Sequence, residues 1–305
     1  MAIGNVPVAV PMTPAVRGIL CMIAGVFVLT TQDAISKWLT ASYHPGEITF
    51  YRGLFSFIPI AVLASRTGGW AALKANRLGA NILRGLFALV TSALIVWAFS
   101  MLPLAEALAI VFASPLILAA LSGPLLGEPV GWRRWACVAV GFVGVILLTR
   151  PSTAGVEWVV LIPLGGALFS ALRDITTRRL GGIDSATTII FYTQLVAVVA
   201  TAPTLLIAFN GWPDLGDWAL LAVSGILIGI AHSFIIQAFL LAEAAVVAPL
   251  RYLALVYAAV LGAILWGDLP DAWAIGGSVL IAASGLYTLH RETTARRRRD
   301  RSGSP

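Results

Sequence analysis

Charged side chains lie inside runs of apolar residues, where a charge is costly. Asp33 and Lys37 stand in the segment TTQDAISKWL, directly after the apolar run GILCMIAGVFVL. Arginines occupy comparable places in TFYRGLF, NILRGLF, ALRDI and PLRYLAL, at positions 52, 84, 173 and 251. A guanidinium group is a planar fork of N–H donors that matches a carboxylate. These arginines are therefore candidates for binding a small carboxylated molecule, and each needs a partner where it is buried.

The composition shows what must position these charges. The 305 residues are 59% hydrophobic and 11% charged, with a mean hydropathy of +0.92, whereas soluble domains are about 25% charged. The apolar runs are continuous rather than alternating, which favours membrane helices over a barrel. We therefore predict an all-α polytopic membrane protein.

Turn residues and charges divide the apolar runs into ten segments of about the length that crosses a bilayer. We predict ten transmembrane helices near residues 18–39, 45–63, 81–100, 104–126, 132–149, 158–177, 185–209, 218–240, 243–265 and 272–290. The N-terminal segment lacks the features of a cleavable signal peptide, so we expect the first span to remain.

Basic residues predict the orientation of these spans. One side carries Arg17, Arg66, Lys74, Arg77, Arg133, Arg134, Arg178, Arg179 and the arginine-rich tail, whereas the other side has only Lys37 and Arg150. Because cytoplasmic loops are rich in Lys and Arg, we expect both termini in the cytoplasm of a bacterial-type inner membrane. The tail RETTARRRRDRSGSP directly follows a span, so we expect it to meet anionic lipid headgroups rather than nucleic acid.

The opening segment has a copy 141 residues further along the chain. This shift places Asp33 on Asp174 and Lys37 on Arg178, and it also aligns FY at 50–51 with FY at 191–192. With a small gap, LAEA at 104–107 matches LAEA at 241–244. Five spans per copy mean that the second copy enters the membrane from the opposite side. The pattern predicts an inverted repeat, an architecture that binds substrate near the bilayer midplane and alternates access around it.

Three segments resemble a known family. They are GEPVGWRRWACVAVGFVGVILLTRP after the fourth span, APLRYLALVYAAVLGAILWGDLPDAWAIGGSVLIAASGLY in the last two spans, and the paired AEA openings. They are similar to the drug/metabolite transporter superfamily, in its ten-helix branch built from two EamA domains. The resemblance implies an N-terminal cytoplasmic segment at 1–15, EamA repeats at 16–150 and 151–290, and a basic cytoplasmic tail at 291–305.

The resemblance also implies a central cavity and a transport function. Members export amino acids, including aromatic ones, and other small metabolites, while others carry sugars, riboflavin-like compounds, S-adenosylmethionine or cationic drugs. We therefore expect a secondary transporter that exports amino acids. The alternative is a transporter that exports or imports one of those other metabolites or drugs. The first span has no acid at its centre, which disfavours proton-coupled export of cations as in the small multidrug relatives.

Depth in the membrane ranks the arginines. At about 1.5 Å per residue, Arg251 and Arg52 lie roughly 10–12 Å from the ends of their predicted helices, near mid-membrane. Arg84 lies within a turn of the cytoplasmic interface. Arg251 and Arg52 are therefore the first candidates to bind substrate, although Arg52 could instead pair with Asp33 or Glu47 and join the first two helices.

Aromatic and polar residues complete the predicted binding site. Most tryptophans lie at span ends and indicate interface belts, which leaves Trp97, Tyr252 and Tyr257 as candidate cavity walls. His232, with Gln237 five residues later, could relay protons or bind substrate. A neutral histidine bonded to helix backbone is the alternative.

Further polar residues are candidate gate or structural pairs. They are Asp33 with Lys37, Asp174 with Arg178, and the matched Glu106 and Glu243. Local pairing, snorkelling of Lys37 and the helix dipole acting on the glutamates are the alternatives. Pro115 and Pro249 interrupt helix hydrogen bonds and are candidate kinks.

Other function classes lack support in the sequence. No HExxH, GxSxG or phosphate-binding loop is present, and the three histidines are scattered, so we expect neither an enzyme nor a metal or other cofactor. Cys21 and Cys137 lie in apolar runs without metal-ligand spacing. A channel is a remote alternative. The sequence is compatible with a monomer or a dimer.

Overall fold

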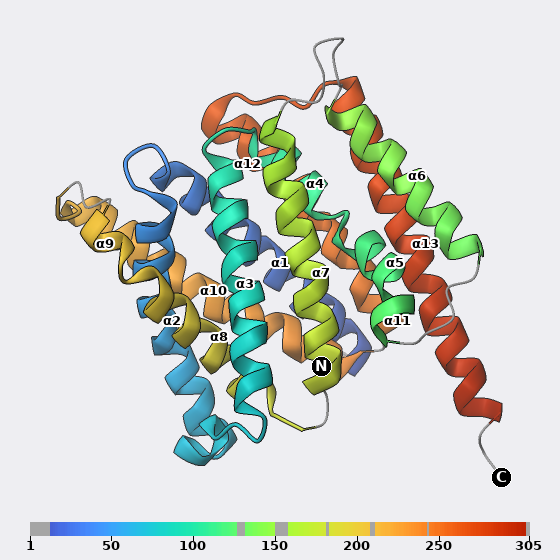
Figure 1. Cartoon of the computed structure of the whole chain (residues 1–305), viewed down its shortest axis with the longest axis horizontal. Coiled ribbons are helices and arrows are strands. Elements are labelled where there is room, and N and C mark those ends of the chain that lie inside the picture. The colour runs from blue at the N-terminus through green and yellow to red at the C-terminus, as the bar shows by residue number, and fades with distance from the viewer. Residues whose placement is uncertain are drawn as a thin grey trace, which may run out of the picture.

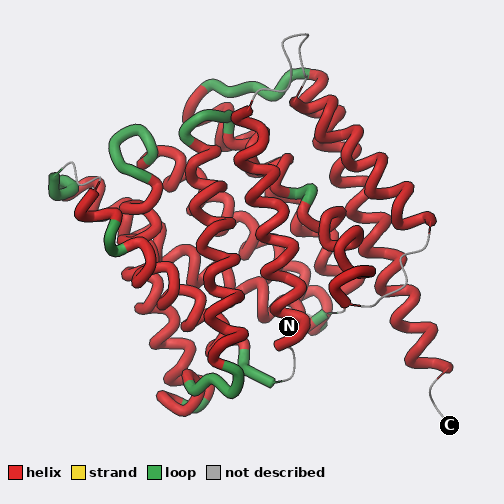
Figure 2. The backbone as a smooth tube through the Cα atoms, in the orientation of Figure 1, coloured by secondary structure: helices red, strands yellow, loops and turns green. Residues whose placement is uncertain are grey.

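The computed structural model describes residues 13–126, 132–149, 158–180, 183–207, 211–242 and 244–302. Within these ranges every regular element is a helix (Figure 2). Eight helical segments are long and apolar enough to cross a bilayer, and two shorter apolar helices, Trp135–Leu148 and Ala272–Tyr287, match the remaining predicted spans. The predicted all-α polytopic fold is confirmed.

The elements follow one another in two similar series. The first series is α1 (Pro14–Leu39), α2 (Pro45–Thr67), η1 (Gly69–Leu73), α3 (Leu78–Phe99), α4 (Leu104–Val111), α5 (Ser114–Leu126) and α6 (Trp132–Thr149). The second is η2 (Trp158–Val160), α7 (Leu161–Leu180), α8 (Ala186–Thr201), α9 (Thr204–Ile207), α10 (Leu215–Leu241), α11 (Ala244–Val247), η3 (Ala248–Tyr252), α12 (Leu253–Trp266) and α13 (Ala272–Ser302).

Several helices begin at residues that satisfy their free backbone N–H groups. His44 and Glu47 form a reciprocal capping box ahead of α2, which opens on Pro45. Ser185 accepts from the N–H of Thr188 at 3.1 Å at the start of α8, and Asp214 caps α10. Short polar side chains at these positions define where each helix starts.

Three spans predicted as continuous helices are broken. The 104–126 span divides into α4 and α5 just before Pro115, the 185–209 span divides into α8 and α9 at Pro203, and the 243–265 span runs as α11, η3 and α12 around Pro249. Proline has no N–H to donate and its ring obstructs the preceding turn, so the helix breaks near it.

The shift of 141 residues applies to the structure as well as to the sequence. It places α1 on α7, α2 on α8 with α9, α3 on α10, α5 on α12 and α6 on α13. Helix packing follows the same relation, because α1 packs on α10 as α7 packs on α3. The self-equivalent pairs α2 with α8 and α6 with α13 also pack, the latter at one edge of the molecule (Figure 1).

Glycines allow the closest helix approaches. A Cβ added to Gly277 of α13 would lie 2.6 Å from the carbonyl oxygen of Gly144 in α6, and a Cβ on Gly144 would lie 2.8 Å from that of Gly277. Small residues of this kind let membrane helices pack backbone to backbone. Gly18 and Gly25 of α1 have the same role against α10.

Polar contacts tie the two halves together in the connecting segments. The Tyr43 hydroxyl donates to Asp217 at 2.6 Å; burial and this hydrogen bond raise the pKa of Tyr43 to about 12. In the equivalent loop of the second half, Asp184 accepts from the backbone of Asn76 and the side chain of Asn81, both at 2.7 Å. Burial acts to raise the pKa of Asp184, but these hydrogen bonds outweigh it and hold the pKa below its ordinary value.

Candidate functional site

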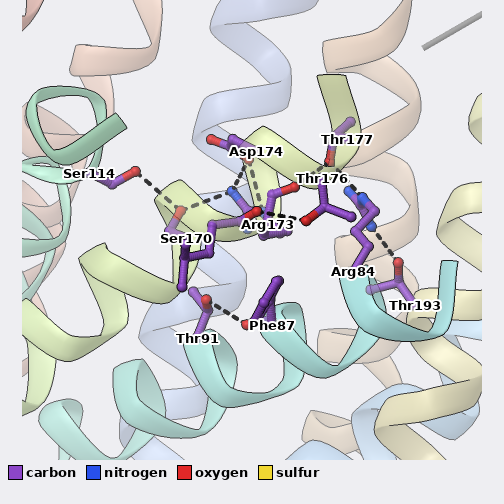
Figure 3. Close-up of polar contacts among 11 residues, drawn as sticks. Arg84, Phe87, Thr91, Ser114, Ser170, Arg173, Asp174, Thr176, Thr177 and Thr193 are labelled. Atoms are coloured by element: carbon purple, nitrogen blue, oxygen red, sulfur yellow. Dashed lines mark hydrogen bonds and ion pairs between the residues drawn. The ribbon is translucent and has the colours of Figure 1, made fainter. Parts of the chain in front are cut away.

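A polar cluster occupies the region where α3, α5, α7 and α8 meet (Figure 3). Arg173 on α7 contacts Asp174 at 2.9 Å and donates to Ser170 at 3.0 Å. Ser170 also accepts from Ser114 of α5 at 3.2 Å. The serines are buried, whereas the Arg173 and Asp174 side chains remain 26% and 34% exposed.

Arg84 of α3 forms the other side of this cluster. Its Nε donates to Thr177 of α7 at 2.7 Å, and its Nη1 donates to Thr193 of α8. The charges of Arg173 and Asp174 both act on Arg84. Arg84 therefore points into the bundle, and the interfacial position expected from its depth does not describe its contacts.

An equivalent arrangement exists in the first half. Arg52 of α2 donates to Ser36 of α1 at 3.2 Å and to Ser92 of α3 at 2.5 Å, and the charge of Asp33 acts on it. Arg52 is only 6% exposed. Ser36 is the counterpart of Thr177, and Asp33 that of Asp174, so each half holds an arginine against the same hydroxyl position and beside the same carboxylate position.

His232 lies on α10, outside the four helices that form the polar cluster. Its Nδ1 is 2.7 Å from the carbonyl oxygen of Ile228 on the same helix. The charges of Arg173, Arg84 and Arg251 all act on it. Arginines from α3, α7 and η3 therefore all contribute to the electrostatic environment of this imidazole.

Lys37 lies at one end of the bundle, which we name the Lys37 end. Its ammonium donates to the carbonyl oxygens of Leu102 at 2.6 Å and Phe99 at 3.3 Å, in the segment between α3 and α4. It also lies 5.2 Å from the ring centroid of Trp266, where α12 ends. A lysine of the first helix thus joins three other helix ends.

Apolar packing closes the Lys37 end. A buried cluster draws Ala34, Ala98, Phe99, Leu104, Ala107, Leu108, Ile162 and Ala258 from five helices of both halves. In this cluster α4 packs against α12. Buried side chains packed in this way leave few voids larger than a water molecule.

The opposite end, which we name the Arg179 end, is packed differently. At this end α11 with η3 corresponds to α4, and α5 corresponds to α12. The described residues show no packing of α11 and η3 on α5 comparable to that of α4 on α12. Likewise α1 packs on α3 at the Lys37 end, without comparable packing between α7 and α10 in the described ranges. Arg179 donates to the carbonyl oxygen of Leu125 at 2.6 Å, joining α7 to α5 alone. The two ends therefore differ although their helices correspond.

The remaining predicted residues take varied places. Arg251 is exposed at the end of η3, and the buried Tyr252 hydroxyl has no partner among the described residues. Tyr257 packs edge-on against Phe27 at 5.4 Å between ring centroids. Trp97 is 43% exposed beside Trp158, and Gln237 is exposed, both outside the polar cluster.

The predicted gate and kink residues are placed only in part. Glu106 lies in the first turn of α4, and its charge and that of Asp268 act on Lys37. Glu243 and the side chain of Arg178 lie outside the described residues. The helix is interrupted between α4 and α5, just before Pro115, and Pro249 lies inside η3.

Sequence reasoning gave too little weight to Arg173 and Arg84. The signal that could have found Arg173 is the internal alignment, since its counterpart in the first half is Gln32, an uncharged residue that is 1% exposed. A charge present in one copy and missing in the other is not explained by the shared fold. Arg84 needed knowledge of which helices meet, because Thr177 and Thr193 are about a hundred residues away.

Known proteins are similar to this chain over most of its length. The sequence profile of the EamA-like transporter family matches residues 16–150 and 157–289. An S-adenosylmethionine uptake transporter of Rickettsia prowazekii is 28% identical over 90% of this chain and 93% of its own length. A riboflavin transporter of Rhizobium johnstonii is 26% identical over 95% and 96%, and the pseudopaline exporter CntI of Pseudomonas aeruginosa is 26% identical over 88% and 94%.

A solved crystal structure has the same fold. It covers 92% of this chain and 98% of its own, with a TM-score of 0.62 and 18% sequence identity. At this identity the likeness concerns the fold alone.

Proposed function

Because the chain belongs to the EamA-like transporter family, and is thus an integral membrane transporter rather than an enzyme, we propose that it exports amino acids by alternating access. Amino acids with aromatic or apolar side chains are the first candidates. The Lys37 end faces outward in this proposal, and both termini lie in the cytoplasm of the inner membrane, as the distribution of basic residues predicts.

The observation that carries alternating access is the difference between two equivalent ends. Helices related by the internal repeat pack together at the Lys37 end, and their counterparts are not comparably packed at the Arg179 end. An inverted repeat can exchange these arrangements, so that the second state closes the opposite end. Such an exchange moves a solute without a continuous pore.

The charges inside the bundle support a substrate with ionised groups. Arg173, Arg84 and Arg251 carry positive charge near His232, and Asp174 adds a carboxylate. Arg251 follows a helix break, where freed backbone groups can also bind a ligand. Arg52 and Arg251 keep their predicted roles in substrate binding, Arg52 through the equivalent cluster of the first half.

S-adenosylmethionine is the second candidate, and the similarity of the uptake transporters over 90% of this chain favours it. This compound carries an amino-acid group together with a sulfonium. Riboflavin has no such group, so it fits the charged residues less well, although a riboflavin transporter is similar over 95% of the chain.

The test is uptake by the purified protein in sealed liposomes preloaded with an amino-acid pool. Labelled methionine, threonine, phenylalanine, lysine, S-adenosylmethionine and riboflavin are compared, with and without a pH gradient. Saturable uptake of several amino acids, stimulated by the internal pool, is the expected result. Uptake of S-adenosylmethionine or riboflavin without any amino acid would contradict amino-acid transport.

Two variants connect this activity with the site. Arg251→Ala should abolish uptake of the carboxylated substrates, whereas Arg66→Ala, which removes an exposed arginine in the last turn of α2, should leave it unchanged. Full activity of Arg251→Ala would remove Arg251 from the binding site.

A further inference from the structure

Two adjacent opposite charges stand within the membrane-spanning helix α7. The Nε and Nη2 atoms of Arg173 both face Oδ1 of Asp174, at 3.0 and 2.9 Å. Among the described residues, no partner contacts Nη1 of Arg173 or Oδ2 of Asp174. Within the part of the chain that the structure describes, the pair therefore retains one donor group and one acceptor without a partner, next to each other.

The exposure of this pair is unusual for its depth. Asp174 lies six residues before the end of α7, about 9 Å along the helix axis, yet the two side chains are 26% and 34% exposed. Charges at this depth are costly against lipid and are normally directed toward the bundle interior or water. The partner of Arg173 indicates its direction, because the guanidinium donates to Ser170, which is buried and bonded to Ser114 of α5.

A structural role alone does not account for the arginine. In the first half the counterpart of Arg173 is Gln32, which donates to Ser36 at 2.6 Å and to Ser224 at 3.3 Å and is 1% exposed. The same helix position is therefore occupied by a neutral side chain whose amide group donates two hydrogen bonds. The first half thus has no charge at this position, whereas the second half has one beside a partly exposed carboxylate.

We propose that Arg173 and Asp174 bind the charged head of a zwitterionic substrate, an α-amino acid group. The guanidinium of Arg173 receives the carboxylate through the donors that Asp174 leaves free, and Oδ2 of Asp174 accepts from the ammonium. Neighbouring charges of opposite sign match an ammonium and a carboxylate attached to one carbon. Arg84 adds positive charge on the carboxylate side while its own donors remain on Thr177 and Thr193.

This assignment rests on the proposed function and makes it specific, since it defines which part of the substrate is recognised. It predicts tolerance of different side chains, because neither charge contacts the substrate beyond its head. It also separates amino acids and S-adenosylmethionine, which carry this group, from riboflavin, which does not.

The experiment measures how methionine analogues inhibit uptake of labelled methionine into liposomes. One analogue, 4-(methylthio)butanoate, lacks the amino group, and the other, 3-(methylthio)propylamine, lacks the carboxylate. With wild-type protein, we expect each to inhibit roughly ten- to a hundredfold more weakly than methionine, the effect of one lost hydrogen bond between charged groups. Equal inhibition by an analogue and methionine would overturn the assignment without any variant.

Two variants then assign each charge to its group. Asp174→Asn should remove the discrimination against the analogue without an amino group and keep the discrimination against the analogue without a carboxylate. Arg173→Gln, which copies Gln32, should remove the discrimination against the analogue without a carboxylate and keep that against the analogue without an amino group. Arg66→Gln is the matched control, since Arg66 is an exposed cation in the last turn of α2, outside the helices of the polar cluster, and its inhibition profile should equal that of wild type. Size-exclusion chromatography in detergent verifies that each variant is folded.

The outcomes separate the two proposals. Methionine uptake with unchanged discrimination in both variants means that Arg173 and Asp174 form a structural ion pair only, and amino-acid transport stands. Absence of saturable uptake of any amino acid by wild-type protein overturns both.

Discussion

Replacing Lys37 by methionine should open the Lys37 end of the bundle. Methionine keeps an unbranched apolar stem but cannot donate to the carbonyl oxygens of Leu102 and Phe99, now 2.6 and 3.3 Å from the ammonium. It also loses the cation's contact with the Trp266 ring. These contacts join α1 to the α3–α4 connection and to the end of α12, so they stabilise the closed arrangement.

The magnitude follows from the contacts. A hydrogen bond from a charged donor contributes about 1.5–3 kcal/mol, and a cation over an aromatic ring at a partly exposed site adds about 0.5–1 kcal/mol. Lys37 is partly exposed, and water replaces some of these contacts when the end opens, so we take about 2 kcal/mol for the set. That free energy changes the ratio of open to closed molecules about 30-fold.

Thiol labelling measures this ratio. Ala258 of α12 is 0% exposed within the apolar cluster of the Lys37 end, so Ala258→Cys should react with a membrane-impermeant maleimide only when that end opens. Cys21 and Cys137 are first replaced by alanine. The labelling rate should rise about 10- to 30-fold with Lys37→Met, and it should stay unchanged with Lys74→Met, which removes an exposed lysine after η1. A folded Lys37→Met protein that labels at the parent rate would refute the reasoning.

Three further predictions concern stability. Gly277→Val should shorten the half-life of the folded protein in detergent on heating, because overpacking against Gly144 costs about 1–3 kcal/mol, while Gly276→Val, with open space at its Cβ position, should change it little. The stabilisation that Tyr43 adds over Tyr43→Phe should be complete below pH 10 and disappear as the pH rises toward 12, since the folded-state pKa is raised from 10.0 to about 12; a melting-temperature difference constant across that window would contradict it. Asp184→Asn should lower the melting temperature above pH 4 and lose this effect as the pH falls below 3.8, because the folded-state pKa of Asp184 lies below that value.

Periodicity and length were sufficient to predict the helical membrane fold, because lipid permits few alternatives to a continuous helix. The shift of 141 residues also anticipated which helices correspond, since Asp33 and Asp174 occupy matching positions on α1 and α7. The break near Pro203 was not predicted, whereas Pro115 and Pro249, expected as kinks, lie where their spans are interrupted. Proline has a local effect, but whether it bends, splits or tightens a helix depends on the neighbours that satisfy the freed groups.

The polar cluster shows where sequence reasoning stops. Depth along a helix suggested an interfacial position for Arg84, but its direction is set by hydroxyl groups on α7 and α8. Such a contact joins positions about a hundred residues apart, and no local pattern encodes it. Arg52 was expected to bind substrate or to join the first two helices, and the described contacts include its bond to Ser36 of α1. A role in substrate binding stays a prediction.

The arginine against the matching hydroxyl position, Ser36 or Thr177, comes from different helices in the two halves, from α2 as Arg52 and from α3 as Arg84. Two halves with identical contacts would present the same chemistry to both ends of the bundle, and these two halves differ in the helix that supplies the arginine. Under the alternating access proposed above, the barriers to opening at the two ends therefore need not be equal, and a mutation at one end can change one of them alone. A change at one of them alters how fast a solute is released on that side, while the concentrations across the membrane still determine where the net flow ends.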